Sequence, residues 1–177
     1  WQQDEDVIIP SFLKLLKFEQ NALLIIAPHE PTVLHLEKLE HEFAGQSSSI
    51  RLSDINNYAN QQIIIVDSIG VLSILYSYAD LAFIGGSFKI NVHNVLEAAV
   101  YGVPVLFGPK IENSQEAKML IEVGGGMMIK DKKEFYRLIR KLFADEKLIA
   151  NCGQNSYEFV HKNVGTTDRI IKEIFSV

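Results

Sequence analysis

Short apolar runs alternate along the chain with segments in which apolar residues recur at helical spacing. Because the short runs are apolar throughout, they are typical of parallel strands buried on both faces. We therefore expect an α/β fold, a Rossmann-like three-layer sandwich with a mostly parallel sheet. The runs predict strands at 21–28, 61–68, 80–87, 102–108 and 125–130, and the spacing predicts helices at 31–44, 70–78, 93–101, 113–122 and 131–143.

The two ends of the chain are predicted to be helical. Residues 1–18 form an amphipathic pattern, and Asp4, Glu5 and Asp6 suit the first turn of a helix. No strand pattern precedes this helix, which favours a piece of a longer protein. Residues 145–177 read as two helices with a break and cap at 165–168, and 45–50 reads as a polar loop.

Composition narrows the class of protein. With 177 residues, 47% of them hydrophobic, the whole chain 1–177 is expected to form a single domain. A net charge of −5 without any long run of Lys or Arg argues against nucleic acid as a partner. Cys152 is the only cysteine, so an internal disulfide is excluded and an idle thiol is expected. Because no apolar run approaches a bilayer span, we expect a soluble chain.

Four loops directly after predicted strands are the places to look for a site. In open parallel sheets, ligands bind beyond the carboxyl ends of the strands, where the loops meet and helix N-termini point their free N–H groups. The loops are expected to lie along one edge of the sheet, at 28–31, 67–70, 85–94 and 108–116.

Gly85, Gly86 and Ser87 follow the strand at 80–87. Glycines there allow backbone amides to approach an anionic group closely, but for this motif by itself a plain tight turn is the favoured explanation. The residues match neither a dinucleotide-binding fingerprint nor a P-loop.

Polar residues gather at the start of the predicted helix 93–101. His93 and Glu97 are four apart and would share a helix face. Asn94 could cap the helix beside a phosphate, and Glu97 could accept hydrogen bonds from a ribose diol; a capping Asn and a solvated Glu are the alternatives. No third ligand stands at a useful spacing, so no metal site is predicted.

The remaining loops have structural explanations. Asn113 or Ser114 could cap the helix at 113–122. Asp67 or Ser68 could cap the helix at 70–78, or the backbone there could read the edge of a base. Pro104 fits the start of a strand, where its missing N–H is tolerated.

Taken together, these motifs resemble one enzyme family. "ADLAFIGGS" at 79–87, "HNVLE" at 93–97, "GVPVLFGP" at 102–109 and Asn113 stand in the order found in the carboxyl-terminal half of the bacterial 3-deoxy-D-manno-octulosonic acid (Kdo) transferases. The resemblance covers nearly the whole chain. It implies the carboxyl-terminal half of a two-domain GT-B glycosyltransferase fold, with CMP-Kdo as sugar donor.

The resemblance also implies roles for individual residues. Gly85, Gly86, Ser87 and the amides near His93 and Asn94 would hold the CMP phosphate, Glu97 the ribose, and Asn113 would help to orient the donor. The flanking loops would enclose the nucleotide through Pro28, His29, Ser68, Ile69 and Gly70. No metal or other cofactor is implied.

The chain departs from the family pattern in two loops. Family members often have Pro-Arg-His after the first strand, where this chain has Pro28-His29-Glu30, so a bidentate anion partner is missing. The family's Gly-Gly before the histidine is Asn91-Val92 here, and Lys89 could supply some of the missing positive charge.

Other implications concern the parent enzyme. In this family, the acceptor site for the lipid A precursor and the catalytic base belong to the amino-terminal domain, so this chain alone is expected to be inactive. The parent would work at the cytoplasmic face of the bacterial inner membrane, with its own amino-terminal domain as partner. Two alternatives stay open: a GT-B domain that uses a UDP- or ADP-sugar, and a non-catalytic Rossmann-like interaction domain.

Overall fold

The computed structural model describes residues 1–165, 171 and 173–175. In this part of the chain, six three-residue strands form two ladders in which every pairing is parallel. The first ladder has the order β1 (Leu24–Ile26), β3 (Ile63–Ile65), β2 (Ser49–Arg51), and the second has the order β4 (Ala82–Ile84), β5 (Val105–Phe107), β6 (Gly126–Met128).

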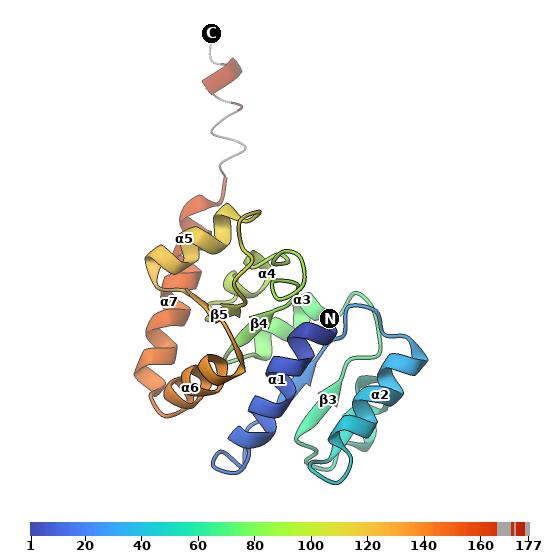
Figure 1. Ribbon diagram of the computed structural model, residues 1–177. Coiled ribbons are helices and arrows are strands. Elements are labelled where there is room, and N and C mark those ends of the chain that lie inside the picture. Colours follow the sequence, from blue (N-terminus) through green and yellow to red (C-terminus); the bar gives the residue numbers. More distant parts are fainter. Residues whose placement is uncertain (166–170, 172, 176–177) are drawn as a thin grey trace.

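Helices connect the strands and cover the ladders (Figure 1). Four of them begin at a side chain that accepts a backbone N–H of the first turn, which explains why they start where they do: Thr32, Ser114, Asp131 and Asp145. The helices are α1 (Gln2–Leu15), α2 (Val33–Phe43), α3 (Leu72–Leu75), α4 (Leu96–Ala99), α5 (Gln115–Val123), α6 (Lys132–Phe143) and α7 (Glu146–Asn163), with the 3-10 helices η1 (Leu52–Asn57) and η2 (Tyr76–Tyr78).

Two apolar clusters show that β5 is covered on both faces. Leu106 belongs to a cluster with residues of α1, α2 and α6, whereas Val105 and Phe107, its neighbours on the strand, belong to a cluster with residues of α4 and α5. Successive side chains of a strand point to opposite faces, so helices lie on both sides of the strand. This arrangement confirms the predicted Rossmann-like α/β fold with parallel strands.

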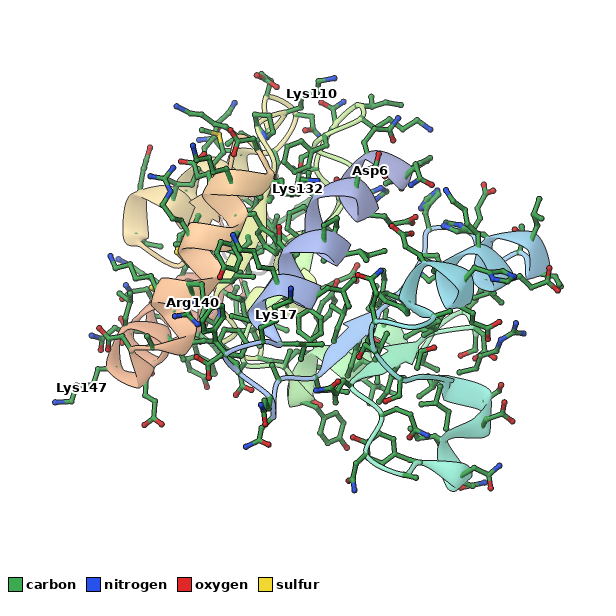
Figure 2. All side chains as sticks on the ribbon, turned by 60° about the horizontal axis from the view of Figure 1, so that its bottom comes forward. Asp6, Lys17, Lys110, Lys132, Arg140 and Lys147 are labelled. Carbon is green, nitrogen blue, oxygen red and sulfur yellow. The ribbon has the colours of Figure 1, made fainter. Side chains whose placement is uncertain are left out.

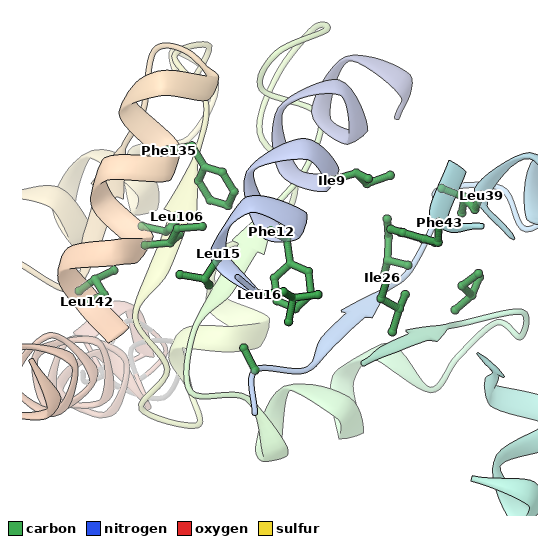
Figure 3. Close-up of a cluster of buried hydrophobic side chains, with 14 of the residues drawn as sticks. Ile9, Phe12, Leu15, Leu16, Ile26, Leu39, Phe43, Leu106, Phe135 and Leu142 are labelled. Atoms are coloured by element: carbon green, nitrogen blue, oxygen red, sulfur yellow. The ribbon is translucent and has the colours of Figure 1, made fainter. Parts of the chain in front are cut away.

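Helix α1 lies in the middle of the larger cluster (Figure 3). Its fully buried Ile9 and Leu15 pack with Ile26 of the first ladder and Leu106 of the second. The Ser11 hydroxyl lies 3.3 Å from the carbonyl oxygen of Lys132 at the start of α6. Helix α1 therefore packs against both ladders, and its first turn is held close to their loops.

The structure corrects several details of the sequence prediction. The segment 45–50 is not only a loop, because Ser49 and Ile50 begin β2, which pairs with β3. The predicted helix 70–78 is divided into α3 and η2, and α3 follows Val71 without a side-chain cap, so neither Asp67 nor Ser68 caps it. The break predicted at 165–168 lies mostly outside the described residues.

Three further features complete the description of the fold. Cys152 is buried in α7, and burial raises the pKa of its thiol. Charged side chains of both signs point away from the ribbon in Figure 2. No helix among the described residues is long and apolar enough to cross a membrane.

Candidate functional site

The loop after β4 is built around Gly86. Its φ of +94° lies in the left-handed region, and a Cβ at this position would stand 2.4 Å from the carbonyl oxygen of Asn91. The Gly86 N–H donates to the Asp4 carboxylate at 2.8 Å. The tight turn and the anion-binding amide, which the sequence left as alternatives, are thus both present, and the anion is a side chain of α1.

Ser87 ties this loop to the loop after β5. It is fully buried, and its Oγ accepts the Gly108 N–H at 2.6 Å. Backbone bonds from Lys110 to Ser87 and from Val92 to Lys110 complete the connection, at 3.1 and 3.0 Å. The loops 85–94 and 108–116 therefore form one rigid unit.

A cluster of rings joins this unit to the loop after β1. Trp1 stacks on His29 with ring centroids 4.0 Å apart, and its indole N–H donates to His93 Nε2 at 3.0 Å. The ring centroids of His29 and His93 are 5.3 Å apart, and Lys89 Nζ lies 3.9 Å from the centre of the Trp1 ring. Three nitrogen-bearing side chains thus surround one indole, next to the buried Pro28.

The residues 93–97 have a different geometry from the predicted one. Helix α4 begins only at Leu96, so His93 lies in the loop and does not share a helix face with Glu97. The backbone N–H of His93 donates to the carbonyl oxygen of Gly85. Asn94 Oδ1 accepts the Leu96 N–H at 3.1 Å, and its amide donates to Glu97 Oε1 at 3.0 Å. Asn94 therefore bonds the first backbone N–H of α4 from the position before the N-cap residue Val95, and it holds the exposed Glu97 carboxylate.

Tyr76 of η2 lies behind this carboxylate. Burial, together with the negative charge of Glu97, raises the pKa of Tyr76 to about 12. A phenol with an ordinary pKa is already neutral near pH 7, and the raised pKa keeps Tyr76 neutral beside Glu97 to a still higher pH.

Two hollows lie at this edge and share Val92 and His93. One, of about 220 Å³, is lined on its far side by Asn94, Asn113, Ser114 and Glu116. The other, of about 240 Å³, reaches Trp1, Gly86 and Lys89. Asn113 is held by a bond of 3.3 Å from its amide to the carbonyl of Val92, and Ser114 caps α5.

The loop after β3 is the most open of the four. Ser68, Ile69 and Gly70 are exposed, and 88% of the Ile69 surface is accessible. Asp67, just before them, accepts the backbone N–H and the hydroxyl of Ser53. Burial alone would raise the pKa of Asp67, but these hydrogen bonds outweigh it and hold the pKa below its usual range.

The structure thus brings together the loops after β1, β4 and β5 but does not link the loop after β3 to them. Within the described part of the chain, Ser68, Ile69 and Gly70 make no side-chain hydrogen bond or ring contact with the other three loops.

Sequence reasoning missed two residues of the site, Asp4 of α1 and Trp1 directly before this helix. Asp4 was expected only to stabilise the start of a helix, and Trp1 had no predicted role. The acidic first turn was visible in the sequence, but nothing there indicated that this turn would reach Gly86, which is 82 positions away.

The described residues contain no group of three or more His, Cys, Asp or Glu side chains that could hold a metal ion. The imidazole, ammonium and amide groups at this edge suit an anionic ligand, and the Glu97 carboxylate suits a hydroxyl donor.

The chain is similar in sequence to several curated transferases. No family model matches the chain. Among curated proteins, it is 31% identical over 168 residues to the 3-deoxy-D-manno-octulosonic acid transferase of Rickettsia prowazekii, 28% over 177 residues to that of Rickettsia bellii and 29% over 176 residues to that of Haemophilus influenzae. The matches cover 91%, 97% and 95% of this chain but only 36%, 42% and 40% of these relatives.

One solved structure has the same fold. The C-terminal CMP-Kdo binding domain of WaaA from Acinetobacter baumannii superimposes with a TM-score of 0.71 at 22% sequence identity. The match covers 85% of this chain and 82% of that domain.

Proposed function

Because the chain belongs to the family of the 3-deoxy-D-manno-octulosonic acid transferases, we propose that it is the donor-binding half of a glycosyltransferase. The full enzyme moves Kdo from CMP-Kdo to a lipid A precursor in lipopolysaccharide biosynthesis. The observation that carries this proposal is sequence similarity to these transferases over 91–97% of the chain. The polar edge described above gives the donor a place to bind.

In this proposal, the donor extends over both hollows. The cytidine ribose lies near Glu97, whose carboxylate is oriented by Asn94 and is free on the surface to accept hydrogen bonds from a diol. The phosphate lies close to His93, which lines both hollows, with His29 and Lys89 as neighbours. These side chains take the place of the missing arginine. Asn113 and the loop 68–70 bound the nucleotide on the outside.

The proposed chemical task is to hold CMP and to stabilise the leaving phosphate. Fixed dipoles and cations act best where charge develops, and the rigid unit of the loops after β4 and β5 holds its groups in place. The acceptor site, the catalytic base and the attachment to the inner membrane are assigned to the amino-terminal part of the parent enzyme. This chain alone, as a single domain, is expected to bind the donor without transferring sugar, and without a metal.

Calorimetric titration with CMP tests the proposal, with UMP and AMP as controls. Selective binding of CMP is expected. Glu97→Ala is expected to weaken CMP binding about tenfold, because two hydrogen bonds to a charged group are lost, while the thermal midpoint stays unchanged. Glu122→Ala, which removes an exposed acid on α5, is the matched control and is expected to leave both values unchanged.

Other results would change the proposal. Tighter binding of UMP or AMP would favour a GT-B domain for a UDP- or ADP-sugar. Failure to bind any nucleotide, together with capture of a stable protein partner, would favour an interaction domain. A fall in thermal midpoint in Glu97→Ala as large as its loss of binding would contradict the role given to Glu97.

A further inference from the structure

Asp4 is a buried acid that the proposed function does not use. Only 3% of its surface is accessible, and its Oδ2 accepts the Gly86 N–H. Its other oxygen, Oδ1, is buried without a hydrogen-bond partner among the described residues. An unpaired carboxylate oxygen costs free energy when buried, so its retention calls for a reason.

A carboxylate of the protein itself is an unexpected partner for the amide of a glycine turn. A glycine turn after a parallel strand presents backbone amides that suit a phosphate. Here the Gly86 amide is already occupied by a negative group that belongs to the protein. A Cβ on Gly85 would also stand only 3.2 Å from Asp4 Oδ2, which shows how closely the carboxylate fills the turn.

Asp4 borders the hollow in which the proposed donor places its anionic part. Gly86, its hydrogen-bond partner, lines the hollow together with Trp1, Lys89 and His93. The Asp4 carboxylate thus lies directly behind the Gly86 amide, and Lys89 and His93 line the same hollow with nitrogen-bearing side chains.

We propose that Asp4 determines specificity by excluding nucleoside diphosphates from this site, so that the site accepts a nucleoside monophosphate linked to a sugar. This inference rests on the proposed function. One phosphate can lie against His29, Lys89 and His93. A second phosphate directed to the glycine turn would meet the Asp4 carboxylate, and like charges at close range are strongly unfavourable.

A site without the Asp4 charge would be expected to prefer CDP to CMP. Without a negative charge next to the turn, a cluster of cationic and imidazole side chains is expected to bind the more highly charged ligand more tightly. A group that repels the extra phosphate would explain a preference for CMP over CDP, and Asp4 is the buried acid that accepts the Gly86 N–H of the turn.

The experiment compares CMP and CDP, which share base and ribose and differ by one phosphate. Their dissociation constants are measured by calorimetry for the unaltered chain, for Asp4→Asn and for Asp6→Asn. The unaltered chain is expected to bind CMP more tightly than CDP. Asp4→Asn keeps the size and an acceptor for the Gly86 N–H but removes the charge, and is expected to shift the ratio about tenfold toward CDP. Asp6 lies in the same helical segment but is exposed (Figure 2), so Asp6→Asn is expected to leave the ratio unchanged.

A second measurement serves if Asp4→Asn does not fold. In the unaltered chain, the preference for CMP is expected to shrink as salt is raised, because ions screen the repulsion. Equal affinities for CMP and CDP in the unaltered chain, or the same ratio in Asp4→Asn as in the unaltered chain, would overturn the inference and leave the proposed function intact. If neither CMP nor CDP bound, the proposed function would fail and the role of Asp4 with it.

Discussion

The loop after β4 and the loop after β3 carry similar residues and are held very differently. Each contains a glycine with positive φ, +94° at Gly86 and +88° at Gly70, and each has a serine beside an apolar strand. Gly86 is enclosed by Asn91 and His93, and Ser87 is fully buried. At Gly70, a Cβ would meet nothing within 4 Å, and Ser68 is exposed.

The difference comes from the elements that reach each loop. Asp4 of α1 and Gly108 after β5 supply partners for the polar groups of the β4 loop. Within the described part of the chain, the side-chain hydrogen bonds to the β3 loop are those from Ser53 to Asp67 at its beginning. Similar residues after a strand thus form a rigid platform in one place and an open surface in the other. A rigid platform suits the positioning of a ligand, and an open surface suits adaptable contacts at its edge.

The largest effect is expected for Gly86→Ala. The added Cβ would collide with backbone in an unfavourable φ region, so we expect a loss of about 3 kcal/mol in the free energy of unfolding. Gly70→Ala, with the same positive φ but open space, is expected to lose about 1 kcal/mol. Urea denaturation measures both, and equal losses would contradict the contrast between the two loops.

A smaller effect is expected for Ser87→Ala. The change leaves the buried Gly108 N–H without its acceptor, and the expected loss is about 2 kcal/mol in the free energy of unfolding. Ser68→Ala, on the exposed loop, is expected to stay within about 0.5 kcal/mol of the unaltered chain. The comparison fails if the exposed serine proves as important for stability as the buried one.

The smallest effect concerns binding. Ile69→Ala is expected to keep the free energy of unfolding within about 0.5 kcal/mol, because the side chain is exposed. It is expected to weaken CMP binding about threefold if the open loop covers part of the nucleotide. Ile74→Ala, which truncates another exposed isoleucine on α3, serves as control and is expected to leave CMP affinity unchanged. Identical CMP affinities in both variants would remove the β3 loop from the proposed site.

The sequence predicted the strands best where the local pattern decides the structure. The run Ile63–Ile65 is buried on both faces, so its composition alone indicates a central strand. Strand β2 was missed because serines precede it and its residues are only half buried. It is a strand because it pairs with β3, and such pairing is not visible in a local pattern.

For the site, the sequence predicted which loops meet but not the contacts within them. The meeting of the loops after β1, β4 and β5 follows from parallel topology. The start of α4 did not follow, because the bond from His93 N–H to Gly85 holds this residue in the loop. The contact of Asp4 with Gly86 depends on how α1 packs across the sheet, and no spacing rule contains that information.

The packing of α1 has a consequence for how the chain folds during synthesis. Its contact with α6, for example from Ser11 to Lys132, spans 121 positions. Ribosomes therefore complete α1 long before the helix that covers its apolar side exists. Until then, Phe12 and Leu15 remain available to other chains and to chaperones, and closing such a long loop makes this step slow. Because the same helix supplies Asp4 to the glycine turn, the docking of α1 also completes the binding edge.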